Sequence, residues 1–278
     1  MLRGIYTGAS GMLANDAKMD TIANNLANVD KNAYKKDINI FKAFPEMLIR
    51  RINESGLGII PVGSYDAMPY VGNLGTGVEV NEVFTDFEQG SLQRTENNFD
   101  LALEGRGFFT IMTEKGERYI RDGAFTINQD GILMTRNGNP VMGENGIIQV
   151  HHNNFIVNER GEIVINGDLS YEPRDVVSMN SNDWSNPIVL DKLKLVDFEY
   201  IRYIKKEGDS MYRETEYSGP PLPPGELKVI QGFLEKSNVN IVREMVDMIE
   251  VQRSYEANQK TVTSHDQTLG KLINEVAR

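Results

Sequence analysis

The two ends of the chain carry the feature that most limits its possible folds, because apolar residues recur there in alternating steps of three and four. Near the N-terminus this pattern is almost unbroken, with Asp16 as its polar member. Its members are Leu2, Ile5, Ala9, Met12, Asp16, Met19, Ala23 and Leu26. Such a heptad pattern is typical of a helix whose apolar stripe faces another helix.

The same steps return near the C-terminus, over a longer stretch with more polar interruptions. The members are Ile241, Met245, Met248, Gln252, Tyr255, Gln259, Val262, Asp266, Leu269, Ile273 and Val276. Ser237, Asn238 or Asn240 can cap the start of this helix. At about 1.5 Å per residue the helix would span roughly 55–60 Å, which is too long to lie across a compact domain. The length predicts a coiled coil or a packed helical assembly.

Two interpretations of these stripes are open. An amphipathic helix more commonly faces the core of its own domain. Here the stripes are terminal and longer than an ordinary helix, so we favour packing between chains. The polar members indicate that the two helices alone would pair weakly and need further neighbours. The apolar residues expected at subunit interfaces are Leu2, Ile5, Met12, Met19, Leu26, Met245, Met248, Tyr255, Val262, Leu269 and Ile273.

Between the helices, short strand-like runs alternate with tight turns such as Asn128–Gly131 and Asn137-Gly138. Turn signals of this density without helices between them indicate an antiparallel β domain. The sequence therefore predicts an α+β fold, in which long terminal helices pair as a coiled-coil-like base and the middle domain is antiparallel and all-β. The expected helical domain comprises residues 1–35 and 232–278, the connectors residues 36–75 and 205–231, and the β domain residues 76–204. Within the last, residues 167–187 resemble an insertion or loop.

Composition and spacing exclude several classes of function. The chain has 29 basic and 40 acidic side chains, a net charge of −11, and so lacks the basic surface that duplex nucleic acid needs. With no Cys and three His, it lacks a thiol nucleophile and Cys ligands for a metal. His151-His152 and Ser264-His265-Asp266 have the wrong spacing for a metal site and a catalytic triad. We expect no enzyme, no cofactor, no metal site, no nucleic-acid partner and no membrane insertion.

Three asparagines close to the end of the first helix call for an explanation, because Asn is a mediocre helix former. They are Asn24, Asn25 and Asn28. Asn24 and Asn28 are four residues apart and share a helix face. Their amides can satisfy backbone groups where the chain leaves the helix. They either end the helix or form a polar latch against a neighbouring chain, and all three are included among the expected interface residues.

Several motifs together resemble those of the bacterial flagellar rod and hook proteins. They occur in the family's order and span almost the whole chain. The motifs are Ala23–Val29 with Tyr34-Lys35 and Phe41; Leu103–Phe109; Tyr119–Phe125 with Gly131–Leu133 and Gly138; and Gly232–Asn240 with Glu244–Val246, Gln252-Arg253, Tyr255-Glu256 and Asn258-Gln259. Where the family usually has a turn glycine, this chain has Ala33, so Asn32 is the candidate for a positive φ there.

The resemblance also bears on the kind of axial protein. The chain is far shorter than a typical hook subunit, which favours the rod. Leu2–Gly11 and Asn139–Gly146 are more similar to a proximal rod subunit, whereas Gly75–Val78 also resembles the distal one. The proximal rod is therefore the expected position, with the distal rod as the alternative.

The resemblance implies a structural subunit of the flagellar drive shaft that transmits torque. Its implied partners are copies of itself, other rod or hook axial proteins and the flagellar type III export apparatus. The implied location is the flagellar basal body, in the periplasm, reached without a cleaved signal peptide. We further expect the terminal segments to be poorly ordered in the free subunit, because an uncovered helix of this kind is marginal in water.

Two alternatives come from other classes. A surface carbohydrate hydrolase, with helical attachment segments, needs two carboxylates that converge in a cleft. Asp122, Glu104 and Asp130 are available for that role. A small adaptor that uses the helices as a grooved docking surface predicts a discrete complex instead of a polymer.

Overall fold

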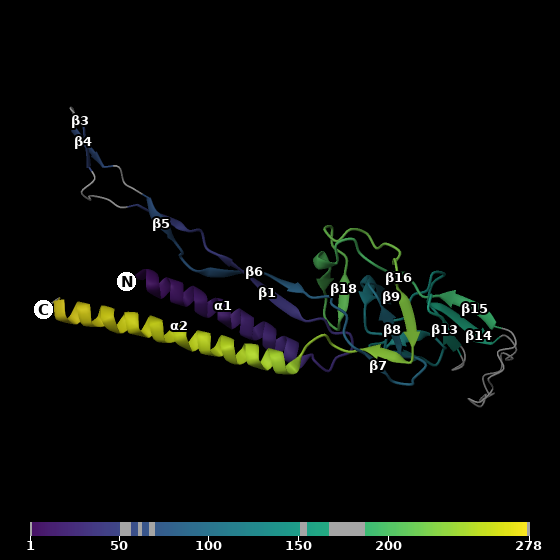
Figure 1. Ribbon diagram of the computed structural model, residues 1–278. Helices are drawn as coiled ribbons and strands as arrows, with labels where there is room; N and C mark the ends of the chain where they lie inside the picture. The colour runs from purple at the N-terminus through teal and green to yellow at the C-terminus, as the bar shows by residue number, and fades with distance from the viewer. Residues whose placement is uncertain are drawn as a thin grey trace. The chain divides into compact units, whose positions relative to one another are not determined.

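The computed structural model describes residues 2–50, 57–60, 63–66, 70–150, 155–166 and 187–276 (Figure 1). The chain divides into two compact units. The helical unit comprises Met1–Leu26, Asp37–Phe84 and Ile241–Arg278, and the β unit comprises Ala27–Lys36 and Thr85–Asn240. His151-His152 and most of the 167–187 stretch lie outside the described residues.

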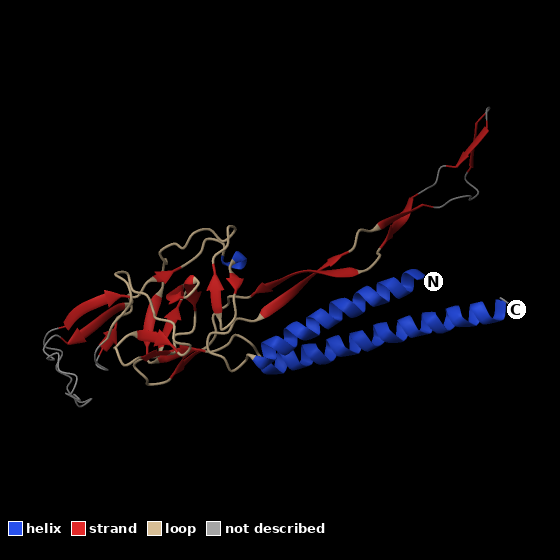
Figure 2. Cartoon of the chain, turned by 180° about the vertical axis from the view of Figure 1, so that it is seen from behind, coloured by secondary structure: helices blue, strands red, loops and turns tan. Residues whose placement is uncertain are grey.

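Two long helices form at the ends of the chain, as the heptad patterns predict. Helix α1 spans Leu2–Ala27, and helix α2 spans Ile241–Val276, a length of 36 residues or about 54 Å. The side chain of Ser237 accepts a hydrogen bond from the Val239 N–H just before α2 begins. Figures 1 and 2 show the helices side by side with both termini at the same end, so they run antiparallel.

A two-stranded ribbon makes up the rest of the helical unit (Figure 2). It consists of nested strand pairs, with β1 (Asp37–Ala43) beside β6 (Val78–Thr85), β2 (Met47–Arg50) beside β5 (Tyr70–Leu74), and β3 (Leu57–Ile60) beside β4 (Gly63–Asp66). The two inner pairs are antiparallel, with Met47 opposite Leu74 and Leu57 opposite Asp66. Residues 36–75, which the sequence predicts to be a connector, therefore contain paired strands.

The β unit contains the remaining strands. They are β7 (Leu92–Arg94), β8 (Leu101–Glu104), β9 (Phe108–Thr113), β10 (Gly116–Ile120), β11 (Phe125–Ile127), β12 (Leu133–Thr135), β13 (Phe155–Val157), β14 (Glu162–Asn166), β15 (Pro187–Lys192), β16 (Leu195–Val196), β17 (Lys205–Lys206), β18 (Met211–Arg213), β19 (Lys228–Gln231) and β20 (Phe233–Glu235), with a 3₁₀ turn at Ile201–Tyr203. The largest sheet has the order β16-β9-β10-β18-β17. A second has the order β13-β14-β15, and the other pairs are β11-β12, β19-β8 and β20-β7. These pairings are antiparallel, as the turn pattern predicts.

Two turns form where the sequence predicts them. The Asn128 side chain accepts hydrogen bonds from the N–H groups of Asp130 and Ile132, so this segment is a turn between β11 and β12. Gly138 follows with a φ of 83°, a conformation that glycine adopts without steric cost. The prediction that Asn32 takes a positive φ is wrong. Ala33, and not Asn32, takes the positive φ of 51° at the turn where the family usually has glycine.

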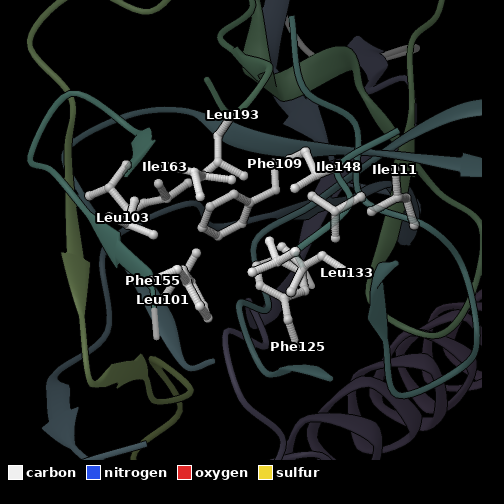
Figure 3. Packing of buried hydrophobic residues seen from close by; sticks show 14 of the residues in the cluster. Leu101, Leu103, Phe109, Ile111, Phe125, Leu133, Ile148, Phe155, Ile163 and Leu193 are labelled. Carbon is white, nitrogen blue, oxygen red and sulfur yellow. The ribbon is translucent and has the colours of Figure 1, made fainter. Parts of the chain in front are cut away.

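The core of the β unit lies on both sides of β9. Successive residues of a strand face opposite ways, so Phe109 and Phe108 enter different clusters. Phe109 lies at the centre of the side chains labelled in Figure 3. Its ring packs edge to face against that of Phe125, with the two ring centroids 5.1 Å apart. Phe108 belongs to a second cluster with Tyr119, Val196, Phe198, Ile204 and Tyr212. The residues of these two clusters all belong to the β unit and form its apolar core.

Among the described residues, no helix combines the length and hydropathy needed to cross a bilayer. In the same part of the chain, no group of three or more His, Asp or Glu side chains converges as metal ligands do.

Candidate subunit interface

The contact between α1 and α2 is built on small residues of α1. A Cβ atom added to Gly4 would lie 2.6 Å from Nε2 of His265, and one added to Gly8 would lie 2.8 Å from Cγ2 of Val262. Glycine at these positions therefore lets the two helices approach closely. Further along, Asn15 donates a hydrogen bond of 3.1 Å to the Ser254 hydroxyl.

This contact face lies one residue away from the predicted stripe on α1. Gly4, Gly8 and Gly11 meet α2, whereas the predicted stripe contains their successors Ile5, Ala9 and Met12. The predicted interface residues Ile5, Met12, Met19 and Leu26 are half-buried, and the side chain of Leu2 lies outside the described part of the structure. The α1 members therefore flank the intramolecular contact and keep part of their surface available.

On α2 the predicted residues divide into two groups. Met248, Tyr255, Val262 and Leu269 are half-buried, and Val262 contacts α1 directly. Met245 and Ile273 are exposed.

Sequence reasoning missed several exposed apolar residues at the start of α2. With Met245, they form what we call the outer stripe: Val242, Met245, Val246 and Ile249. Val242 is 72% exposed and Val246 57%. A second set of apolar residues at helical spacing beside the heptad stripe was the signal that could have found them. Large apolar side chains gathered on one exposed face mark an interaction surface.

The asparagines near the end of α1 differ in their surroundings. Asn25 is buried, and its side chain holds the backbone of Asp37 at two points: Nδ2 donates to the Asp37 carbonyl and Oδ1 accepts from its N–H, both at 2.9 Å. Its Nδ2 also lies 3.4 Å from a carboxylate oxygen of Glu244 on α2. Asn25 therefore ties α1 to the start of β1 and to α2. Asn24 is exposed and Asn28 is half-buried.

A buried ion cluster in the β unit joins the motifs that carry the family resemblance. The carboxylate of Glu235 accepts from Lys35 Nζ at 2.6 Å and from Arg121 Nε at 2.7 Å, and all three side chains are almost fully buried. Arg121 also donates to the carbonyls of Gly107, Leu103 and Gly105. The N-terminal, central and C-terminal motifs thus meet at one carboxylate, which sequence periodicity did not reveal.

The charges in this cluster set the pKa values of its members. Burial alone would raise the pKa of the Glu235 carboxyl, but the two cations and their hydrogen bonds outweigh it and hold that pKa below its ordinary value. Burial lowers the pKa of Lys35, although Glu235 opposes this effect.

The three carboxylates available to a hydrolase do not converge in one hollow. Asp122 lines a hollow of about 290 Å³ together with Asp30 and Asp209, and neither Glu104 nor Asp130 lies in its wall. The Asp122 side chain accepts a hydrogen bond from the Ala124 N–H, and burial raises the pKa of this carboxyl. Asp130 accepts from the Asn128 side chain in the turn before β12.

Comparison with known proteins bears on the choice between a flagellar axial protein and a hydrolase. The family model "Flagella basal body rod protein" matches residues 5–34, "Flagellar hook protein FlgE/F/G D1 domain" residues 102–165, and "Flagellar basal body rod FlgEFG protein C-terminal" residues 230–275. The flagellar basal-body rod protein FlgG of Buchnera aphidicola subsp. Schizaphis graminum is 32% identical over 98% of this chain and 99% of its own length. FlgG of Borreliella burgdorferi is 32% identical over the whole of both chains, and FlgG of Bacillus subtilis 30% identical over 99% of both. The chain belongs to the flagellar basal-body rod protein family.

Membership of the rod family favours the structural interpretation over the hydrolase alternative. These three relatives are all named rod proteins. Each of them aligns with this chain over nearly its full length. The three matching regions coincide with α1, with the consecutive strands β8 to β14 of the β unit, and with β20 and α2. Arg121 and Glu235 lie within the second and third regions, and Lys35 directly follows the first.

Proposed function

We propose that this rod subunit polymerises through its terminal helices into an axial shaft that transmits torque. The outer stripe of α2 is the observation that carries the proposal. Burying a large apolar side chain contributes roughly 1.5–3 kcal/mol, so covering several of them in a neighbour offsets much of the cost of ordering the helices. A structural subunit needs such a surface and needs no catalytic site.

Coiled-coil-like packing is part of this proposal. Within one chain the first turns of α1 meet α2 through Gly4, Gly8 and Gly11, so large side chains of α1 do not interlock with α2 over that stretch. Ile5, Met12, Met19 and Leu26 on α1, with Met245 and Ile273 on α2, retain surface that neighbouring helices can cover. Methionines suit this role because their flexible side chains adapt to inequivalent neighbours. Asn24 and Asn28 are proposed as polar contacts at the same interfaces.

The partners and the route follow from the family. We propose copies of this chain and other rod or hook axial proteins as neighbours, after export through the flagellar type III apparatus without a cleaved signal peptide. The rod then assembles in the periplasm, where docking against neighbouring chains further stabilises terminal helices that pair only weakly in the free subunit.

The position along the rod remains a prediction. The names of the relatives specify the rod and no position within it. The sequence resemblance favours the proximal rod over the distal rod. Tomography of a deletion strain distinguishes the two, since loss of the rod from its base supports the proximal position and a truncated rod supports the distal one.

A charge placed in the outer stripe tests the proposed function. Val246→Lys leaves the monomer folded, because the side chain is exposed, but buries a charge on assembly. We expect its far-UV circular dichroism to match wild type and motility to be lost. Gln267→Lys is the control, because it adds the same charge at an exposed polar position of α2. Motile cells with intact filaments in the Val246→Lys strain would contradict the proposal.

A further inference from the structure

We propose that an apolar groove of the helical unit receives the outer stripe of α2 from a second copy of the chain. This inference rests on the proposed function and names the two surfaces that would mate. The groove has a volume of about 600 Å³, and its walls come from the start of α1, from β2 and β5, and from α2. Tyr6, Thr7, Met47, Leu74 and Thr261 are among its lining residues.

The groove and the outer stripe match in length. The α1 wall runs from Arg3 to Gly8, or about 8 Å, and the stripe runs from Val242 to Ile249, or about 11 Å. The stripe is apolar only over this stretch, because Arg253, Glu256 and Lys260 continue the same helix face towards the C-terminus. Two turns of apolar helix thus meet a groove of comparable length.

The charges at the rims of the two surfaces are complementary. Arg3 lines the groove, and Glu250 lies one turn after Val246 beside the stripe. In the described part of the chain, neither side chain has an oppositely charged group within salt-bridge distance. A second copy docked by its stripe would bring the two within reach of each other, which favours one orientation of docking.

The groove is also continuous with the α1–α2 contact. Gly4, Gly8 and Asn258 belong to both. A docked helix would therefore extend an existing helical packing arrangement by one more helix.

The two surfaces face different ways. Residues are spaced by about 100° around an α-helix, so the centre of the outer stripe lies about 170° around α2 from Asn258 and about 110° from Thr261, both of which line the groove. A chain cannot fill its own groove with its own stripe, and two copies docked in this way leave one groove and one stripe open. Such a head-to-tail contact continues into an open filament unless its rotation closes a ring.

Disulfide trapping in assembled rods tests this pairing, because the chain has no cysteine of its own. Cells coexpress full-length Tyr6→Cys and Met245→Cys chains, and the isolated basal bodies are oxidised. We expect a covalent dimer that contains one of each variant. Leu13→Cys replaces Tyr6→Cys in the control, because both side chains are 71% exposed on α1 and Leu13 does not line the groove. The control dimer should be at least tenfold weaker.

The outcomes separate this inference from the proposed function. A Met245→Cys homodimer, or a mixed dimer no stronger than the Leu13→Cys control, overturns the pairing while leaving the rod function intact. If rods incorporate Leu13→Cys chains but exclude Tyr6→Cys or Met245→Cys chains, that result supports the pairing. Absence of the unsubstituted chain from isolated basal bodies contradicts the proposed function itself.

Discussion

At the scale of single residues, Glu235 connects segments that lie far apart in the sequence. Its Oε1 accepts from Lys35 Nζ and from the backbone N–H of Gly90, while its Oε2 accepts from Arg121. The Glu235 carbonyl accepts a further bond of 2.8 Å from the Ala33 N–H. Charge-assisted hydrogen bonds of this kind are stronger than neutral ones, and their loss leaves buried groups without partners.

Replacing Glu235 by Gln should destabilise the chain by about 3–5 kcal/mol, because two buried cations lose their common anion. The unfolding midpoint in urea measures this loss. Glu144→Gln is the matched control, since the Glu144–Lys192 pair has a similar distance of 2.8 Å but is largely exposed. Its loss should stay below about 1 kcal/mol. Equal effects of the two substitutions would show that the buried cluster contributes no more than a surface pair.

The lowered pKa of Glu235 also predicts a dependence of stability on pH. The unfolded chain takes up this proton near the ordinary value of 4.5, and the folded chain does so only at lower pH. The stabilisation is therefore present above about pH 4.5 and lost as pH falls through the folded-state pKa. Urea titrations from pH 7 downwards should show the stability gap between wild type and Glu235→Gln narrowing below pH 4.5. A constant gap would contradict this assignment.

Replacing Ala33 by Gly should stabilise the folded chain. Its φ of 51° is unfavourable for an L-residue with a Cβ atom, and glycine avoids that cost. Ala33→Gly should raise stability by up to ~1 kcal/mol, measured as a higher thermal midpoint. Ala124→Gly is the control, because Ala124 is also buried but has no positive φ, and it should lower the midpoint. A lower midpoint for Ala33→Gly would show that packing of the methyl group outweighs backbone strain.

At the scale of elements, regular patterns were predictable and distant pairings were not. The heptad steps gave α1 and α2, and Asn137-Gly138 gave a turn, because these signals are local. The ribbon from β1 to β6 escaped prediction, since its strands pair with partners up to about forty residues away in a stretch with several prolines. The α1 contact face was displaced by one residue because glycine does not count as apolar in a periodicity search.

The close contact at Gly8 predicts that a large side chain destabilises the chain at position 8 of α1 more than at position 9. Gly8→Leu places a side chain against Val262 and should cost about 1–3 kcal/mol through overpacking, despite the better helix propensity of Leu. Ala9→Leu, on the predicted stripe, should be tolerated in the monomer. Limited proteolysis of both purified variants measures the difference. Faster cleavage of Ala9→Leu than of Gly8→Leu would place the contact on the predicted stripe.

At the scale of the whole molecule, the chain passes between its two units four times, and the β unit holds the segments next to these passages together. The Asn238 side chain accepts from the Lys36 N–H and donates to the carbonyls of Asp86 and Glu88, all at 2.9–3.1 Å. Lys35 also donates to the Glu88 carbonyl. Force applied to any one of these segments is therefore shared by the others, which suits a subunit that transmits torque.

Chemical labelling of a single thiol tests whether the outer stripe becomes buried between subunits. Val246→Cys gives the chain a single thiol at a position that is 57% exposed in the free subunit. A maleimide probe should modify this thiol rapidly in purified monomer and at least tenfold more slowly in intact isolated basal bodies. Labelling of denatured basal bodies measures the total number of thiols. Equal labelling rates in monomer and intact rod would show that the outer stripe stays exposed after assembly.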